Sequence, residues 1–115
     1  MTKQNNIIDL ELGKTLVGSK VAAKKMLAML VAVLPQERKA IKDSLEKKDL
    51  IRFLSLVHKL HGGTCYCGVP RLKQAAFDLE VALKTAKNIS AIKKAHAYLD
   101  KEIAALLRAY KKLIS

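Results

Sequence analysis

The sequence predicts an all-α domain: an antiparallel, up-and-down four-helix bundle with one or more additional short N-terminal helical segments. Half of the 115 residues are hydrophobic, which is enough for a single domain, residues 1–115, with a real core. Ala, Leu, Lys and Ile are abundant, whereas the chain has only two Pro and five Gly, and this bias favours helices. No alternating Val/Ile/Thr pattern bounded by turn signals predicts a strand.

The N-terminal part is expected to form a short helix. Residues 1–8 are expected to be frayed, and Asp9 is a suitable cap for a helix that runs to about Val17. Gly13 is expected to weaken this helix and Gly18 to end it.

A longer helical region follows, with Ser19 as its cap. Its apolar run Met26–Leu34 predicts a segment that is covered on more than one side. Pro35 interrupts the pattern, so either the helix kinks there or a new helix begins with proline in its first turn. The segment Gln36–Lys48 carries a thin apolar stripe and is expected to be exposed.

Two further helices are expected in the middle of the chain. Asp49 is a suitable cap for the first, which is expected to run to about Tyr66. After a short turn, the second is expected to run from Pro70 to about Lys87.

The last helix, capped by Asn88 or Ser90, has the most regular apolar stripe of the chain. Its members alternate at spacings of three and four, as in a bundle: Ile92, Ala95, Leu99, Ile103, Leu106, Tyr110 and Leu113. In the preceding helix, Phe77 and Val81 lie off the core stripe and are expected to pack on another element, such as the N-terminal helix.

The helix after Asp49 carries the candidate site. Its apolar residues recur at helical spacing and predict one buried stripe: Leu50, Phe53, Val57 and Leu60. At about 100° per residue, His58 lies well off the centre of that stripe, and so it is expected to face solvent. Gly62 follows one turn later and would leave space beside the imidazole.

The residues around His58 resemble the signature H-x-L-K-G-S/A/G of histidine phosphotransfer (HPt) domains, here HKLHGG in residues 58–63. The family commonly carries G, RL and LE at offsets that Gly68, Arg71-Leu72 and Leu79-Glu80 occupy in this chain. The longer run HKLHGGTCYCGVPRLK resembles most closely the C-terminal HPt domains of hybrid sensor histidine kinases of the BarA/GacS type.

This resemblance implies that His58 is the phosphoacceptor of a phosphorelay in two-component signalling. It would take a phosphoryl group from a receiver-domain aspartate of a hybrid sensor kinase and transfer it to the aspartate of a response regulator. The resemblance implies no cofactor of the chain's own, because magnesium is expected on the partner receiver. Since no ATP-binding motif is present, the chain is expected to be a relay intermediate rather than an autonomous enzyme or autokinase.

Supporting roles follow from the same resemblance. Gly62 would leave room for the receiver, and Ile51 and Ser55, on the same side of the helix as His58, are candidates for the docking surface together with Gly62. His61 stands where the family often has a lysine near the phosphoryl group; a histidine is only partly charged at pH 7. Lys59 could compensate, although it points in another direction.

The chemistry of the residues agrees with a relay. An ordinary imidazole is mostly neutral at pH 7 and can act as a nucleophile without an activating base. Phosphoryl transfer depends mainly on positioning and charge neutralisation, which a receiver would supply. The net charge of +12 suits an acidic partner surface.

Other kinds of function have weaker support. The carboxylates show no paired spacing for acid–base catalysis, and no GxSxG or phosphate-binding loop is present. A basic helical adaptor for an acidic protein or nucleic acid remains the first alternative, although an aromatic content of 4% offers no stacking platform for nucleic acid.

A metal-binding bundle is the second alternative, because His58, His61, Cys65 and Cys67 lie close together in the sequence. The nearby glycines would hold such ligands poorly, so the two cysteines are expected to be reduced, packed thiols. His96 is expected to be an ordinary histidine at the edge of the core.

The longest apolar run has nine residues, far short of the roughly 20 that span a bilayer, and the N-terminus does not resemble a secretion signal. We therefore expect a cytoplasmic monomer without membrane contact of its own, either free-standing or the cytoplasmic C-terminal part of a membrane-bound sensor kinase.

Overall fold

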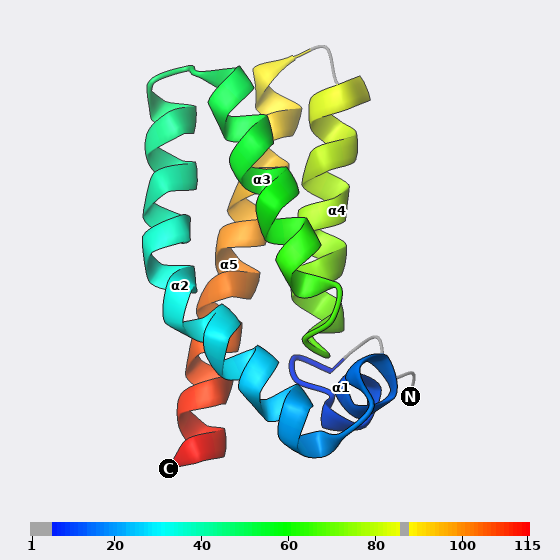
Figure 1. The fold of residues 1–115 in the computed structure, drawn as a ribbon. Helices are drawn as coiled ribbons and strands as arrows, with labels where there is room; N and C mark the ends of the chain where they lie inside the picture. The colour runs from blue at the N-terminus through cyan, green and yellow to red at the C-terminus, as the bar shows by residue number, and fades with distance from the viewer. Residues whose placement is uncertain (1–5, 86–87) are drawn as a thin grey trace.

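The computed structural model describes residues 6–85 and 88–115, and within these ranges it contains five helices and no strand. The helices are α1 (Leu10–Val17), α2 (Lys20–Glu46), α3 (Leu50–Thr64), α4 (Pro70–Thr85) and α5 (Ile89–Ile114). Helices α2 to α5 run alternately up and down, and α1 lies across the lower end of the bundle (Figure 1). The prediction of an all-α, up-and-down bundle with a short N-terminal helix is confirmed.

Each bundle helix packs on two neighbours: α2 and α4 each contact both α3 and α5, and α1 contacts α2. The side chains that fill the core are fully buried along each helix, for example Leu27, Phe53, Leu79 and Leu106. No helix in the described part of the chain is long and apolar enough to cross a membrane.

Side-chain caps begin four helices at the predicted residues. Asp9, Ser19 and Asp49 accept hydrogen bonds from the backbone N–H groups three residues later, at 3.0, 3.1 and 3.2 Å. Asn88, rather than Ser90, caps α5, with its side-chain oxygen 2.9 Å from the backbone nitrogen of Ala91.

Pro35 lies inside α2, which continues as one helix on both sides of it. Figure 1 shows that α2 changes direction between its lower and upper halves. Proline cannot donate the hydrogen bond to the preceding turn, and its ring crowds that turn, which explains a bend. Of the two alternatives from the sequence, the kinked helix is therefore correct.

The N-terminal segment is more ordered than the sequence predicts. Ile7 and Ile8 are partly buried against the core, so the expectation of fraying is wrong for these residues. Asn6 is exposed, and residues 1–5 lie outside the described residues. Burial of the apolar side chains of Ile7 and Ile8 is favourable because it removes them from water. A prediction from cap residues alone does not take this free energy into account.

Gly13 and Gly68 allow this segment to pack closely. A Cβ atom on Gly13 would lie 3.0 Å from the Cβ of Ala23, and the backbone N–H of Asp9 donates to the carbonyl of Gly68 at 2.8 Å. Gly13 is thus a point of close approach between α1 and α2, not merely a weak position in a helix.

Two buried or half-buried ion pairs tie α5 to its neighbours. Arg38 on α2 binds both carboxylate oxygens of Asp100, at 2.6 and 2.9 Å, and this hydrogen bonding lowers the pKa of Asp100. Arg71 on α4 binds Glu102, whose side chain is 3% exposed, with both contacts at 3.0 Å. The arginine of the RL motif therefore has a structural partner.

Phe77 and Val81 do not pack on α1, contrary to expectation. Both lie on α4 and are 47% and 41% exposed, and the described contacts of α1 are with α2. Since α1 lies across the end of the bundle, it leaves this face of α4 open (Figure 1).

Candidate functional site

His58 lies in the middle of α3 with its side chain turned to solvent. The side chain is 73% exposed, whereas Phe53, Val57 and Leu60 on the opposite face are fully buried. Since these three residues hold the helix against the core, His58 is presented from a rigid element. The exposure of His58 predicted from the apolar stripe is confirmed, whereas Leu50, the first residue of that stripe, is 39% exposed rather than buried.

A buried carboxylate from α4 reaches this histidine. Glu80 has a side chain that is only 7% exposed, and its Oε2 lies 2.9 Å from Nδ1 of His58. Its other oxygen, Oε1, lies 2.8 Å from Nδ1 of His61, and Lys84 Nζ is 3.7 Å from Oε2. One carboxylate thus faces two imidazoles.

The two contacts differ in kind. His58 and Oε2 form a hydrogen bond, but no donor in residues 6–85 and 88–115 forms a well-directed hydrogen bond with Oε1, despite the short distance to His61. The His61 contact is therefore a close approach of Nδ1 to a carboxylate oxygen, which a positive charge on that imidazole would strengthen.

The surroundings keep Glu80 ionised. Burial is the largest single influence and raises its pKa, but the hydrogen bond from His58 and the positive potential of the two histidines together lower it below the usual value. A buried carboxylate that stays ionised needs such partners, because an isolated charge in the core would be costly.

The hydrogen bond to Glu80 also determines which ring nitrogen of His58 carries the proton. An ionised carboxylate only accepts hydrogen bonds, so Nδ1 of His58 must carry the proton. In the neutral ring Nε2 then holds the free electron pair. The arrangement presents a nucleophilic nitrogen at the surface, held in orientation by Glu80.

The space next to His58 is open. Gly62, one turn later, is exposed, and a Cβ atom built on it would meet nothing within 4 Å. Lys59 and Ser55 are exposed as well. The predicted access to the imidazole is therefore present.

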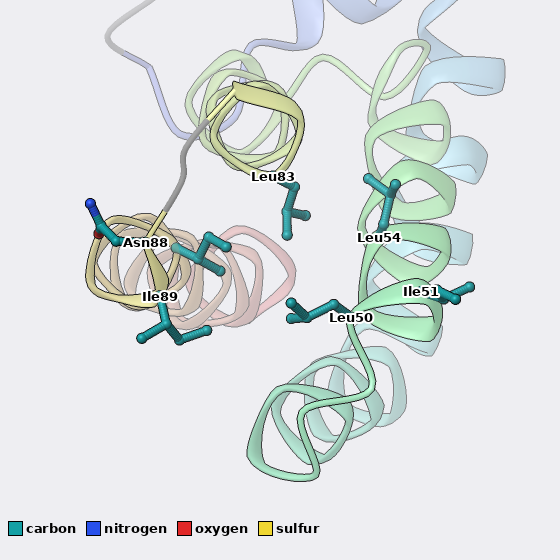
Figure 2. A pocket seen from close by; sticks show the side chains of 7 residues that line it. Leu50, Ile51, Leu54, Leu83, Asn88 and Ile89 are labelled. Atoms are coloured by element: carbon teal, nitrogen blue, oxygen red, sulfur yellow. The ribbon is translucent and has the colours of Figure 1, made fainter.

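Ile51, the third predicted docking residue, is 87% exposed in the first turn of α3. It borders a groove of about 360 Å³ with Leu50, Leu54, Leu83, Asn88, Ile89 and Ile92. Figure 2 shows Leu50 and Leu83 pointing toward the shared space, whereas Ile51 points away from it on the other side of α3. Ile51 thus lies at the border of the groove and offers most of its apolar side chain to solvent.

His61 is more enclosed than His58, with a side chain that is 21% exposed. The ring of Phe77 packs beside it at a tilted angle, with 5.7 Å between the ring centroids. Phe77, which the sequence did not link to the site, therefore forms one wall of it.

Glu80 is the residue that reasoning from the sequence missed. In the sequence it stands only in the LE pair of the family resemblance, which assigns it no role at the site. Its offset from His58 was the available signal, but periodicity within single helices does not show which residues of α3 and α4 meet.

The remaining histidine and the cysteines have environments of their own, although Sγ of Cys65 lies 3.4 Å from the backbone carbonyl oxygen of His61. His96 is half-buried, with its ring edge-on to Phe53 at 5.8 Å, and burial lowers its pKa, as expected for a histidine at the edge of the core. Cys65 and Cys67 are free thiols; Cys67 is buried, and burial raises its pKa. In the described part of the chain, no three His, Cys, Asp or Glu residues are placed to hold a metal ion.

Comparisons with known proteins point to one family. A family model described as "Hpt domain" matches residues 25–109. The sensor protein GacS of Pseudomonas syringae pv. syringae is 39% identical over 101 residues, which cover 87% of this chain and 11% of GacS. The sensor histidine kinase GacS of Pseudomonas protegens is 42% identical over 79 residues, 68% of this chain and 9% of that protein.

BarA of Escherichia coli K12, a signal transduction histidine-protein kinase, is 36% identical over 63 residues, 55% of this chain and 7% of BarA. A crystal structure of the HPT domain from a hybrid histidine kinase of Shewanella superimposes with a TM-score of 0.83 at 30% identity, covering 98% of this chain and 96% of that one. The chain thus spans only about a tenth of the GacS proteins, but nearly the whole solved domain.

Proposed function

Since the chain belongs to the Hpt domain family, a family of phosphotransfer modules, we propose that it is a phosphorelay intermediate with His58 as its phosphoacceptor. It accepts the phosphoryl group from the aspartate of a receiver domain in a hybrid sensor kinase and transfers it to the aspartate of a response regulator. The observation that carries this proposal is the hydrogen bond from Nδ1 of exposed His58 to buried Glu80.

The step needs little from this chain beyond a positioned nucleophile. The electron pair of His58 Nε2 attacks the phosphorus of the aspartyl phosphate, and the bond from phosphorus to the aspartate oxygen breaks. The aspartate leaves with that electron pair as a carboxylate, while the proton on Nδ1 stays in its hydrogen bond to Glu80. Transfer to the second receiver is the reverse of this step.

Glu80 stabilises the ring as it becomes positively charged. When Nε2 bonds to phosphorus, the imidazole acquires a positive charge that the ionised carboxylate 2.9 Å from Nδ1 offsets. Glu80 is therefore a positioning residue that acts through His58. Magnesium is expected on the receiver, where it would neutralise charge on the phosphoryl group.

The assignment of His58 is tested by transfer from a phosphorylated receiver. Receiver domains from the organism that supplies the chain are phosphorylated with acetyl phosphate, freed of donor and mixed with the chain. Wild type is expected to gain an acid-labile, base-stable phosphate, and His58→Gln to gain none, because glutamine has no nucleophilic nitrogen. His96→Gln should label like wild type; equal labelling of His58→Gln would rule out the assignment.

The docking surface is tested separately by Ile51→Asn. A receiver that covers His58 over roughly 800 Å² reaches about 16 Å from its centre, and Ile51 lies two helical turns away, about 10 Å. Loss of this exposed apolar side chain is expected to reduce transfer from the receiver about tenfold. Labelling by phosphoramidate, a small donor that needs no docking, should be unchanged.

Val21→Asn is the matched control. Val21 is also an aliphatic residue, 67% exposed, and also the second residue of its helix. That helix, α2, begins at the opposite end of the bundle from the start of α3 (Figure 1). Val21→Asn is expected to leave both transfer from the receiver and labelling by phosphoramidate unchanged. If Ile51→Asn transfers as fast as Val21→Asn, Ile51 is not a docking residue.

A further inference from the structure

We propose that His61 is a positioning residue whose positive charge stabilises the phosphorylated state of His58, so that the transfer equilibrium of this chain depends on the protonation of His61. The proposal rests on the assignment of His58 as phosphoacceptor. It gives a role to the position at which this chain departs from the lysine of the family signature.

The first argument is the shared carboxylate. Glu80 places one oxygen at 2.9 Å from Nδ1 of His58 and the other at 2.8 Å from Nδ1 of His61. The carboxylate cannot turn without losing one of these contacts. His61 therefore restricts the rotation of Glu80 and keeps Oε2 toward His58.

The second argument is the enclosure of His61. Its side chain is 21% exposed, and the ring of Phe77 lies against it. Buried Oε1 of Glu80 faces its Nδ1 without a well-directed hydrogen bond from any described residue. A proton on Nδ1 of His61 satisfies this oxygen, whereas an unprotonated Nδ1 would set two electron pairs against each other; when Nε2 is protonated as well, the ring adds a positive charge opposite the carboxylate.

The third argument is distance to the phosphoryl group. His58 and His61 are three residues apart on α3, a spacing at which side chains are neighbours on a helix, about 5–6 Å between Cβ atoms. A phosphoryl group on Nε2 of His58 adds about two negative charges to this surface. A protonated His61 provides a positive charge close to it.

The charges around His61 come from two helices. From α4, Glu80 faces the ring of His61, and Nζ of Lys84 lies 3.7 Å from Oε2 of Glu80. From α3 itself, His58 contacts the same carboxylate. Helix α2 meets the other side of α3 through apolar groups such as Leu30, near Gly63. Of these groups, an imidazole is the kind whose charge changes between pH 5 and 8.

The direction of the pH effect follows from linkage. If the charge on His61 stabilises the phosphorylated chain, then the phosphorylated chain holds more protons than the free chain in this range. Acid therefore favours phosphoryl on the chain, and rising pH favours phosphoryl on the receiver. A lysine at this position would keep its charge throughout and would lack this dependence.

The test compares wild type with His61→Lys and His61→Gln, using the receiver domain that phosphorylates the wild-type chain best. The fraction of phosphoryl on the chain is measured at equilibrium from pH 5.5 to 8.5. The result is expressed as the ratio of this fraction between wild type and each variant. Because all three proteins contain His58 and are measured with the same receiver, the pH effects of His58 and of the receiver cancel in these ratios.

Wild type is expected to match His61→Lys at pH 5.5 and to approach His61→Gln at pH 8.5, a change of about fivefold in the ratio to His61→Lys. Ratios that stay constant with pH would overturn the role of His61 while leaving His58 as phosphoacceptor. Failure of every receiver to label wild type would overturn both. Urea unfolding of the three proteins shows whether each is folded at both ends of the pH range.

Discussion

Replacing Glu80 by leucine is expected to slow phosphoryl transfer to His58 about a hundredfold. Leucine fills the buried space but cannot accept the proton of His58 Nδ1, which Glu80 holds at 2.9 Å. The ring can then rotate, or carry its proton on Nε2, and the attacking electron pair is no longer held at the surface. The rate of transfer from a phosphorylated receiver domain, followed in single turnover, measures the effect.

Glu80→Gln is the control for this prediction. The amide oxygen of glutamine can still accept from Nδ1 but carries no negative charge to offset that of the ring, so this variant should be slower than wild type and faster than Glu80→Leu. Urea unfolding of both variants separates a loss of positioning from a loss of fold. If leucine and glutamine slow transfer equally in folded proteins, the hydrogen bond does not position His58.

Replacing Gly68 by alanine is expected to lower the free energy of unfolding by about 2–4 kcal/mol. Gly68 has a φ of 65°, and a Cβ atom there would overlap the carbonyl oxygen of Asp9 and crowd the backbone of Gly13. The substitution therefore adds backbone strain and displaces α1 from the end of the bundle. Urea denaturation followed by circular dichroism measures the change.

Gly18→Ala separates the two causes. Gly18 also has a positive φ, 94°, but a Cβ atom on it would meet nothing within 4 Å. The free energy of unfolding of this variant should fall by only about 1 kcal/mol, because only the backbone strain contributes. Equal losses at both positions would show that close packing around Gly68 contributes little to stability.

Much of the bundle could be predicted from the sequence because its signals are local. The caps Asp9, Ser19 and Asp49 depend on residues within one helix, and the structure confirms them. The stripe of α5 is confirmed as far as Tyr110, whereas Leu113, near the end of the helix, is 49% exposed. The exposure of His58 follows in the same way from the buried stripe of its own helix.

Contacts between helices could not be predicted, because they depend on how two helices are aligned. Glu80 meets His58 and His61 only because α4 packs on α3 in one particular register. The same limit explains the wrong partner expected for Phe77, which lies beside His61. Gly13, expected from the sequence only to weaken its helix, is a point of close contact between α1 and α2 that only the packed structure reveals.

The phosphorylated nitrogen is the most direct test of this account. Wild-type chain, labelled with ¹⁵N in its histidines and phosphorylated by a receiver domain, can be examined by ¹⁵N and ³¹P NMR in alkaline buffer. Because Glu80 holds the proton of Nδ1, the account predicts one phosphoryl group per chain, on Nε2 of His58. A phosphoryl group on Nδ1 of His58, on His61 or on His96 would contradict it.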